Sequence, residues 1–575
     1  MTTRLLLSLA VLSTLLGCQG LSTRPPDIKA PAPVATPSVE TDLPRIPLTS
    51  EILYFTLLGE IAGHRGQMEL SVGALTRTAQ KTRDPRLAER ATLAALYARR
   101  PPEALSNAKL WVELRPDSNE AREALGAAYL ESGKPAEARE QFEKLLAMSA
   151  QANLGQSYLR ISAVLGRQSN RTETLGLMQE LVERHPGQPA AHYAHAHLAV
   201  RASDLPVAIQ AIDRALAISP NWEEAALFKA RVLVSMKDLN KVQRFHEQYL
   251  DDQPRATAMR LSYARLLVDQ KQWDKAREQY KKVIAANPRD ADAMFMISQL
   301  ALQSGDLADA KKYLQRTLVL QPENDQARLA LGQVAEQQKR YDDAIAAYSA
   351  VDSAELHFDA QTRLGVALAA QGKLEQARAH LHALLPKNEA QRVQLALAEE
   401  QILRDARRYP ESMDVLTRVL EDFPDNAELL YARALVAEKL NQVDVAERDL
   451  RRILKKDPKN SNALNALGYT LADRTGRYQE ALGFIEQALA LKPDDPFILD
   501  SMGWVQYRLG NHAEALKHLR AALEKRSDAE IAAHLGEVLW VSGDRAAAEQ
   551  VWKGALKHSP DSEALLGVIS KFKPK

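Results

Sequence analysis

The residues best suited to chemistry are a single cysteine and one cluster of histidines. Cys18 is the only cysteine among 575 residues, and its thiol is a potential nucleophile. The stretch AHYAHAH holds His192, His195 and His197. His192 and His195 are three residues apart, so on a helix they share a face and could bind one ion. No carboxylate or cysteine completes a closed site, so we expect these histidines to pack or line a surface, with no metal and no cofactor.

The surroundings of Cys18 indicate export. Arg4 precedes an apolar run from Leu5 to Leu16, and the small Gly17 stands before the cysteine. This order is typical of a signal peptide, and the run is shorter than the roughly 20 residues that a bilayer span requires. The tetrad ending in Gly17-Cys18 resembles the bacterial lipobox, although Leu16 is larger than usual there. The resemblance implies cleavage between Gly17 and Cys18 and lipidation of Cys18. Gln19, which is not aspartate, implies sorting to the outer membrane. The alternatives are an ordinary signal peptide with a chance cysteine, or a buried N-terminal helix.

The chain after the cysteine changes in composition twice. Residues 19–48 contain seven prolines and few apolar side chains, which predicts an extended tether; a partner-binding motif is the less favoured reading. The whole chain has 75 basic and 74 acidic residues, and removal of Arg4 with the signal balances them. Such neutrality gives no electrostatic reason to expect nucleic acid as a partner.

From residue 49 onward the pattern is helical and periodic. Apolar residues recur every three or four positions, and prolines recur every 34 residues at Pro186, Pro220, Pro254, Pro288 and Pro322. Small residues follow each proline at a fixed distance, as at Gly126, Gly468 and Gly503, with alanines twelve or thirteen positions later. We interpret the first small residue as the contact between two helices of one hairpin. We interpret the alanine as the contact with the next hairpin.

This 34-residue period resembles the tetratricopeptide repeat. It implies an all-α solenoid, a right-handed superhelix of about 13 to 15 helix hairpins with an inner groove. We place the signal peptide at 1–17, the lipidated cysteine and tether at 18–48, and two divergent hairpins at 49–116. The repeats then span 117–560, with weaker units near 351–424, and a capping helix and tail occupy 561–575.

The resemblance also implies which residues face the groove, because set positions of the first helix of each repeat point inward. The candidate residues in the middle of the chain are Tyr193, His197, Arg231, Arg265, Phe295 and Gln299. Those near the C-terminal end are Tyr431, Asn465, Tyr469, Trp504, Tyr507 and Arg508. Tyrosine, tryptophan and arginine are the types that anchor protein interfaces. Each residue taken singly could equally serve packing between repeats.

No motif for catalysis is visible, so we expect no enzyme activity. HExxH, GxSxG, GxGxxG and GxxxxGK[ST] are all absent from the sequence. The basic run RRILKK at 451–456 is predicted to be a solvated helix face, or alternatively a docking patch for a partner.

Three stretches together carry a closer resemblance: LLGCQG, TRDPRLAERATLAALYAR at 82–99, and PDDPFILDSMGWVQYRLG at 493–510. They resemble proteobacterial outer-membrane tetratricopeptide lipoproteins, above all adaptors of the periplasmic carboxyl-terminal processing protease. The resemblance implies a lipid-anchored protein on the periplasmic face of the outer membrane. Its partners would be that serine protease and the peptidoglycan cross-link hydrolases that the protease degrades. The alternative is a scaffold lipoprotein for assembly of a pilus or for exopolysaccharide export.

Overall fold

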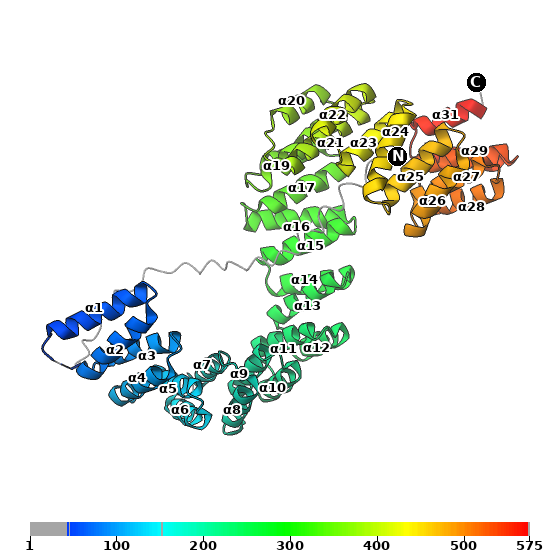
Figure 1. Ribbon diagram of the computed structural model, residues 1–575. Helices are drawn as coiled ribbons and strands as arrows, with labels where there is room; N and C mark the ends of the chain where they lie inside the picture. Colours follow the sequence, from blue (N-terminus) through cyan, green and yellow to red (C-terminus); the bar gives the residue numbers. More distant parts are fainter. Residues whose placement is uncertain (1–42, 45, 151–152, 573–575) are drawn as a thin grey trace. The chain divides into compact units, whose positions relative to one another are not determined.

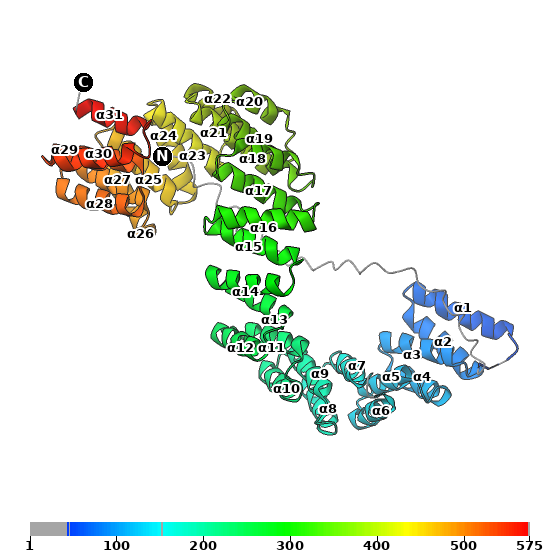
Figure 2. The same cartoon turned by 180° about the vertical axis from the view of Figure 1, so that it is seen from behind.

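The computed structural model describes residues 43–44, 46–150 and 153–572, and these residues form 31 α-helices without a strand. The expected all-α fold is confirmed. Helices α1 to α30 form fifteen consecutive hairpins, and α31 follows the last one (Figure 1, and from behind in Figure 2). Cys18, Gly17 and the tether up to residue 42 lie outside the described residues. None of the described helices is long and apolar enough to cross a membrane.

Contacts divide the chain into two compact units, with the division between Ala293 and Met294. The N-terminal unit contains α1 (Ser50–His64), α2 (Met68–Thr82), α3 (Pro85–Tyr97), α4 (Pro101–Leu114), α5 (Asn119–Glu131), α6 (Pro135–Met148), α7 (Leu154–Leu165), α8 (Arg171–Glu183), α9 (Pro189–Arg201), α10 (Leu205–Ile218), α11 (Glu223–Ser235), α12 (Leu239–Asp252), α13 (Thr257–Asp269) and α14 (Trp273–Ala286).

The C-terminal unit begins within the first turn of α15. It contains α15 (Ala291–Gln303), α16 (Leu307–Leu320), α17 (Asp325–Gln337), α18 (Tyr341–Ser349), α19 (His357–Ala370), α20 (Leu374–Ala383), α21 (Glu389–Asp405), α22 (Tyr409–Asp422), α23 (Ala427–Lys439), α24 (Val443–Lys456), α25 (Ser461–Arg474), α26 (Tyr478–Leu491), α27 (Pro496–Arg508), α28 (His512–Lys525), α29 (Ala529–Val541), α30 (Arg545–Leu556) and α31 (Glu563–Phe572).

Close contact at the small residues holds each hairpin together. A Cβ added to Gly332 would lie 2.3 Å from the ring of Tyr348, and one added to Gly503 would lie 2.5 Å from Leu519. In both hairpins the second helix therefore places a large side chain directly against the backbone of the first. The interpretation of the first small position as an intra-hairpin contact is thus confirmed.

In most hairpins the turn is short because one residue takes the left-handed conformation after the first helix; the turns α7–α8 and α25–α26 are exceptions. Glycine occupies this place at Gly510 (φ 86°), where it has no Cβ to oppose that conformation, whereas Lys271 occupies it at φ 58°. Between hairpins, a proline follows the end of the second helix. The carbonyl group of this proline has no hydrogen-bond partner within the helix. Side chains six residues later satisfy some of these carbonyls: His192 binds the carbonyl of Pro186 at 2.9 Å.

Candidate functional site

One group of polar and aromatic contacts lies on the first helices of the last repeats, in the C-terminal unit. Repeats of 34 or 35 residues place Tyr431, Asn465 and Asp500 at the same position of α23, α25 and α27. Tyr469 and Trp504 likewise occupy one shared position of α25 and α27. Because successive first helices pack side by side, these side chains line up across neighbouring helices.

A buried ion pair joins two of these helices. The Nδ1 atom of His534, on α29, lies 3.0 Å from both carboxylate oxygens of Asp500, and both side chains are at most a tenth exposed. Burial by itself would lower the pKa of His534, but the charge of Asp500 and the hydrogen bond to it outweigh burial. They raise that pKa to about 9. His534 is therefore positively charged at neutral pH and donates its proton to Asp500.

Aromatic rings enclose the charged imidazole. Trp504 stacks on His534 with ring centroids 4.3 Å apart and planes 26° apart. The hydroxyl of Tyr469 lies 3.4 Å from Nε2 of His534, and Nε1 of Trp504 donates to the carboxylate of Asp473 at 3.1 Å. Stacking of a cation on tryptophan is attractive, so the group holds one geometry.

Asp500, His534 and Tyr469 are arranged in a line, in the order carboxylate, imidazole and hydroxyl, as in a proton relay. Their protonation states, however, do not allow a proton relay. The imidazole already carries its second proton at neutral pH and cannot accept another. Burial raises the pKa of the Tyr469 hydroxyl well above its usual value, so it also keeps its proton. The buried pair therefore joins α27 to α29 and offers no general base.

The remaining C-terminal candidates differ in how they are held. Tyr507 donates to Glu537 at 3.3 Å, and Arg508 donates to the hydroxyl of Tyr478 at 2.9 Å. Asn465 is 5% exposed, and its carbonyl oxygen has no hydrogen-bond partner. Tyr431 is half-buried, and burial is the main cause that raises its pKa to about 12. Of these candidates, Tyr431, Tyr507 and Arg508 keep part of their side chains exposed, and they are of the residue types that anchor protein contacts.

A second aromatic cluster lies in the N-terminal unit, on α9 and α11 and the turn between α10 and α11. Tyr193 contacts Trp222 and Phe228 with ring centroids 4.7 and 5.5 Å apart. His197 stacks on Phe228 at 4.0 Å, and its Nε2 atom is buried without a hydrogen-bond partner. Burial lowers the pKa of His197, with a further contribution from Arg231, so its imidazole is neutral at neutral pH. The guanidinium carbon of Arg231 lies 5.8 Å from the Phe228 ring.

The other middle candidates do not join this cluster. Arg265, on α13, is exposed. Phe295 and Gln299 are half-buried on α15 and belong to the C-terminal unit, where Phe295 packs against the core formed by α16 and α17. The set predicted for the middle of the chain is therefore split between the two units.

The histidine cluster and the basic run have structural roles. His192 binds the carbonyl of Pro186, and burial is the main cause that lowers the pKa of His195 to about 4. No group of three or more histidine, aspartate or glutamate side chains within the described ranges is arranged to hold a metal ion. In the basic run, Arg451 pairs with Glu480 at 2.5 Å and Arg452 pairs with Asp425 at 2.7 Å, both on the surface.

The structure also shows features that the sequence interpretation missed. Four apolar side chains of α1 are about half exposed: Leu53, Tyr54, Leu57 and Ile61. We call these four residues the α1 face. The sequence signal for it was present, because α1 is apolar on most sides and no earlier hairpin is predicted to cover it. The Asp500–His534 pair also had a signal, since an acid and a histidine 34 residues apart fall on neighbouring helices.

Comparison with known families agrees with this geometry. The Tetratricopeptide repeat pattern matches residues 77–153, 164–221, 243–292, 261–310, 295–354, 431–496 and 501–565. The chain belongs to the tetratricopeptide-repeat family. The matched ranges leave out 355–430, where α20 is a short helix of 10 residues and α21 a long one of 17. A tetratricopeptide-repeat protein is suited to protein–protein interaction or scaffolding.

The chain is similar to TPR repeat-containing protein PA4667 of Pseudomonas aeruginosa, with 40% identity over 542 residues that cover 92% of this chain and 90% of the relative. Among solved structures, a tetratricopeptide repeat protein of Parabacteroides merdae is 17% identical, covering 49% of this chain and 97% of that one, with a TM-score of 0.33. Yeast Tom70 is 13% identical, covering 91% of this chain and 99% of its own, with a TM-score of 0.35. Neither structural similarity gives information about the binding partners of this chain.

Proposed function

We propose that this tetratricopeptide-repeat protein is a non-catalytic lipoprotein adaptor of the outer membrane. It binds a periplasmic carboxyl-terminal processing protease and presents peptidoglycan cross-link hydrolases to it for degradation. The identity of the partners comes from the sequence resemblance carried by residues 15–20, 82–99 and 493–510. The observation offered in support of an adaptor is that the exposed α1 face and the aromatic group around Trp504 and His534 lie in different units of the chain.

The first surface is the α1 face. Leu53, Leu57 and Ile61 are spaced by four residues, so they form one stripe along the helix, and each is between 45% and 50% exposed. An isolated exposed leucine is ordinary, but a continuous apolar stripe along the first described helix is a face that can pack against another protein. We assign this face to the protease.

The second feature is the group around Trp504 and His534. These two side chains are only 7% and 8% exposed, so the half-buried Tyr431, Tyr507 and Arg508 beside them would make the contact, which we assign to the hydrolases. An adaptor that holds two proteins at once raises their effective concentration without doing chemistry itself. The tether predicted at residues 19–48 could extend on the order of 90 Å at about 3.1 Å per residue, which would keep the assembly near the peptidoglycan.

Replacing Leu57 by glutamate is expected to reduce stimulation of the protease by at least tenfold. The substitution places a charge in the middle of the α1 face, where docking would have to bury it. Degradation of a purified cell-wall hydrolase by the protease, with and without the adaptor, measures the effect. Hydrolase binding to the variant should be unchanged.

The matched control is Leu239→Glu, because Leu239 is also 50% exposed but lies on α12. It should leave both activities intact. Loss of hydrolase binding rather than protease stimulation in the Leu57 variant would reverse the assignment of the two surfaces. Equal stimulation by the wild type and the Leu57 variant would rule out the α1 face as the protease contact.

Replacing Cys18 by serine is expected to release the protein from the outer membrane into the periplasmic fraction. The lipid chains attached to this thiol would provide the anchor, since each buried CH₂ contributes about 0.8 kcal/mol. Cell fractionation with metabolic labelling by a palmitate analogue measures both location and lipidation. Labelling of the serine variant would contradict the proposed lipid site.

The partners themselves are tested by affinity capture of the lipidated protein from envelope extracts, followed by mass spectrometry. Recovery of a serine protease together with cell-wall endopeptidases supports the adaptor. Recovery of pilus or polysaccharide-export proteins without a protease would instead favour an assembly scaffold.

A further inference from the structure

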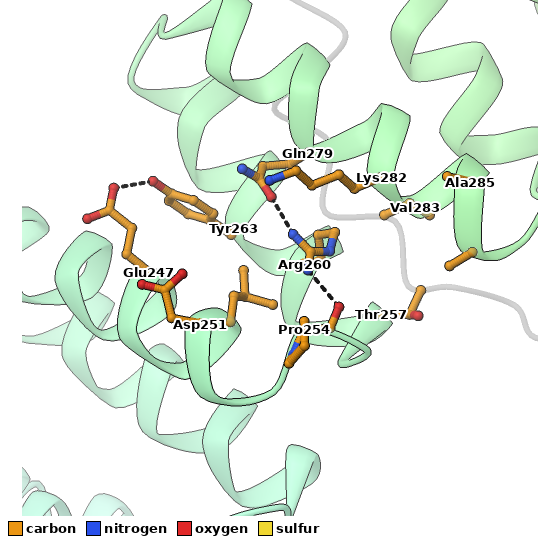
Figure 3. A pocket seen from close by; sticks show the side chains of 12 residues that line it. Glu247, Asp251, Pro254, Thr257, Arg260, Tyr263, Gln279, Lys282, Val283 and Ala285 are labelled. Carbon is orange, nitrogen blue, oxygen red and sulfur yellow. Dashed lines mark hydrogen bonds between the residues drawn. The ribbon is translucent and has the colours of Figure 1, made fainter.

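A cavity of about 760 Å³ opens between α12, α13 and α14 in the N-terminal unit (Figure 3). Part of its wall is apolar, formed by Leu250, Val283, Ala285 and Ala286. The rest of the wall includes four charged side chains together with polar ones such as Thr257, Tyr263 and Gln279. This cavity is separate from both surfaces assigned above, and its volume is large enough for a short peptide segment.

Arg260 is a buried cation in the wall of this cavity, and its hydrogen-bond partners are neutral. Its side chain donates to Oε1 of Gln279 at 2.8 Å and to the carbonyl of Pro254 at 2.7 Å, as drawn in Figure 3. The residue is 9% exposed and makes no ion pair with any described residue. Burial lowers the pKa of Arg260 from its usual 12.5, but the guanidinium stays charged at neutral pH. A buried charge without a counter-charge is costly, so the site favours an anion.

Three other arginines also lie six residues after a proline, and two of them meet a carboxylate. Arg328, six residues after Pro322, pairs with Asp325. Arg392, six residues after Pro386, lines a smaller cavity of about 220 Å³ and pairs with Asp422. In these two repeats a carboxylate of the chain itself neutralises the arginine. The third, Arg122, resembles Arg260 in donating to a proline carbonyl and to a glutamine, but it is half-buried and lines neither cavity. At Arg260 no carboxylate of the described chain takes that place.

The other charged side chains of the cavity indicate how many negative groups the ligand carries. Lys282 contributes a second positive charge to the wall. Glu247 and Asp251 lie together beside Tyr263 on another part of the wall, where Glu247 accepts a hydrogen bond from the Tyr263 hydroxyl (Figure 3). Two carboxylates repel a polyanion such as nucleic acid, whereas a ligand with one negative group can place it at Arg260.

We propose that this cavity binds a polypeptide segment through a single carboxylate held by Arg260 and Lys282. The planar guanidinium still has free N–H groups, and its geometry suits the two oxygens of a carboxylate. An apolar side chain of the same segment packs against Leu250 and Val283. The carboxylate is that of a chain terminus or of an acidic side chain.

The test is isothermal titration of the full chain, in detergent, with three short peptides. The probes are acetyl-Ala-Ala-Leu with a free carboxylate, the same peptide with a terminal amide, and acetyl-Ala-Asp-Leu amide. We expect at least one carboxylate peptide to bind at least tenfold more tightly than the uncharged amide. The terminal and side-chain probes then distinguish the two sources of the carboxylate.

Arg260→Gln should weaken binding of the carboxylate peptide by at least tenfold, and Lys282→Gln should weaken it severalfold. The matched control is Arg122→Gln, because Arg122 also donates to a proline carbonyl, of Pro116, and to a glutamine, Gln141, but is more exposed and lines neither cavity. It should bind the peptide as the wild type does. Circular dichroism shows whether each variant folds, and Lys282→Gln keeps the test decisive if Arg260→Gln does not.

Equal binding of the carboxylate and amide peptides would overturn the proposal, as would displacement of the peptide by inorganic phosphate at lower concentration than by acetate. The measurement requires neither the protease nor a hydrolase. A negative result in this binding experiment would therefore not contradict the adaptor function. A negative result for the adaptor function would likewise not contradict peptide binding in this cavity.

Discussion

Replacing Gly536 by alanine is expected to destabilise the last hairpin by about 3 kcal/mol. A Cβ at this position would lie 1.9 Å from Nε1 of Trp552, which is closer than any contact allows. Trp552 is 2% exposed, and its ring stacks on Trp540 and Phe572, so it has no free space to move into. Its displacement would also break the hydrogen bond to the carbonyl of Ala533.

The effect should be local, because each repeat in a solenoid contacts only its neighbours. Amide hydrogen exchange should therefore rise in α29, α30 and α31 and remain unchanged in α5 and α6. Gly554→Ala is the matched control: it lies in α30, and an added Cβ there meets nothing within 4 Å. That change should stabilise the hairpin by about 0.5–1 kcal/mol, since alanine favours a helix over glycine. Unaltered exchange in the Gly536 variant would show that the contact with Trp552 is looser than described.

Replacing Asp500 by asparagine is expected to destabilise the α27–α29 region by about 3 kcal/mol at pH 7. His534 would then remain buried without the carboxylate to which it is hydrogen-bonded, and only the charges of Glu530 and Asp473 would still favour its protonated form. The matched control is Asp494→Asn, because the side chain of Asp494 is 85% exposed and pairs with Lys525 on the surface. The control should change stability by less than about 0.5 kcal/mol.

The same pair predicts a pH dependence. The pKa of His534 is about 9 in the folded protein, above the ordinary value of 6.5. A raised pKa contributes stability that is fully present below pH 6.5 and is lost as the pH rises through 9. Two and a half pKa units correspond to on the order of 3 kcal/mol.

Hydrogen exchange of α27 to α29, measured between pH 6 and pH 9.5 and corrected for the intrinsic pH dependence of exchange, should show this loss in the wild type. Because Asp500 makes the largest contribution that raises the pKa, ahead of Glu530 and Asp473, the slope should be much smaller in Asp500→Asn. A wild-type region whose stability is independent of pH over this range would contradict a charged His534.

The sequence by itself determined the repeat architecture. A hairpin is a local structure, and its requirements are visible as residue types at fixed spacing: a small residue such as Gly503, a buried alanine such as Ala515, and a proline such as Pro493. Each contact within a hairpin joins residues fewer than 34 positions apart, so the pattern in one period is sufficient to predict it. The register also predicted which helix faces carry the aromatic candidates.

Only the tertiary structure decided which of those candidates meet. Phe295 and Gln299 share the register of Tyr193 and His197 but fall in the other unit, because the division of the chain depends on contacts summed over many repeats. Whether Arg260 has a counter-charge could not be read from its register either. Arg328 and Arg392 stand six residues after a proline like Arg260, yet each meets a carboxylate whose position depends on the local fit of neighbouring helices. The repeat period determines the helix position from which a side chain projects. The packing of the neighbouring helices determines which groups that side chain contacts.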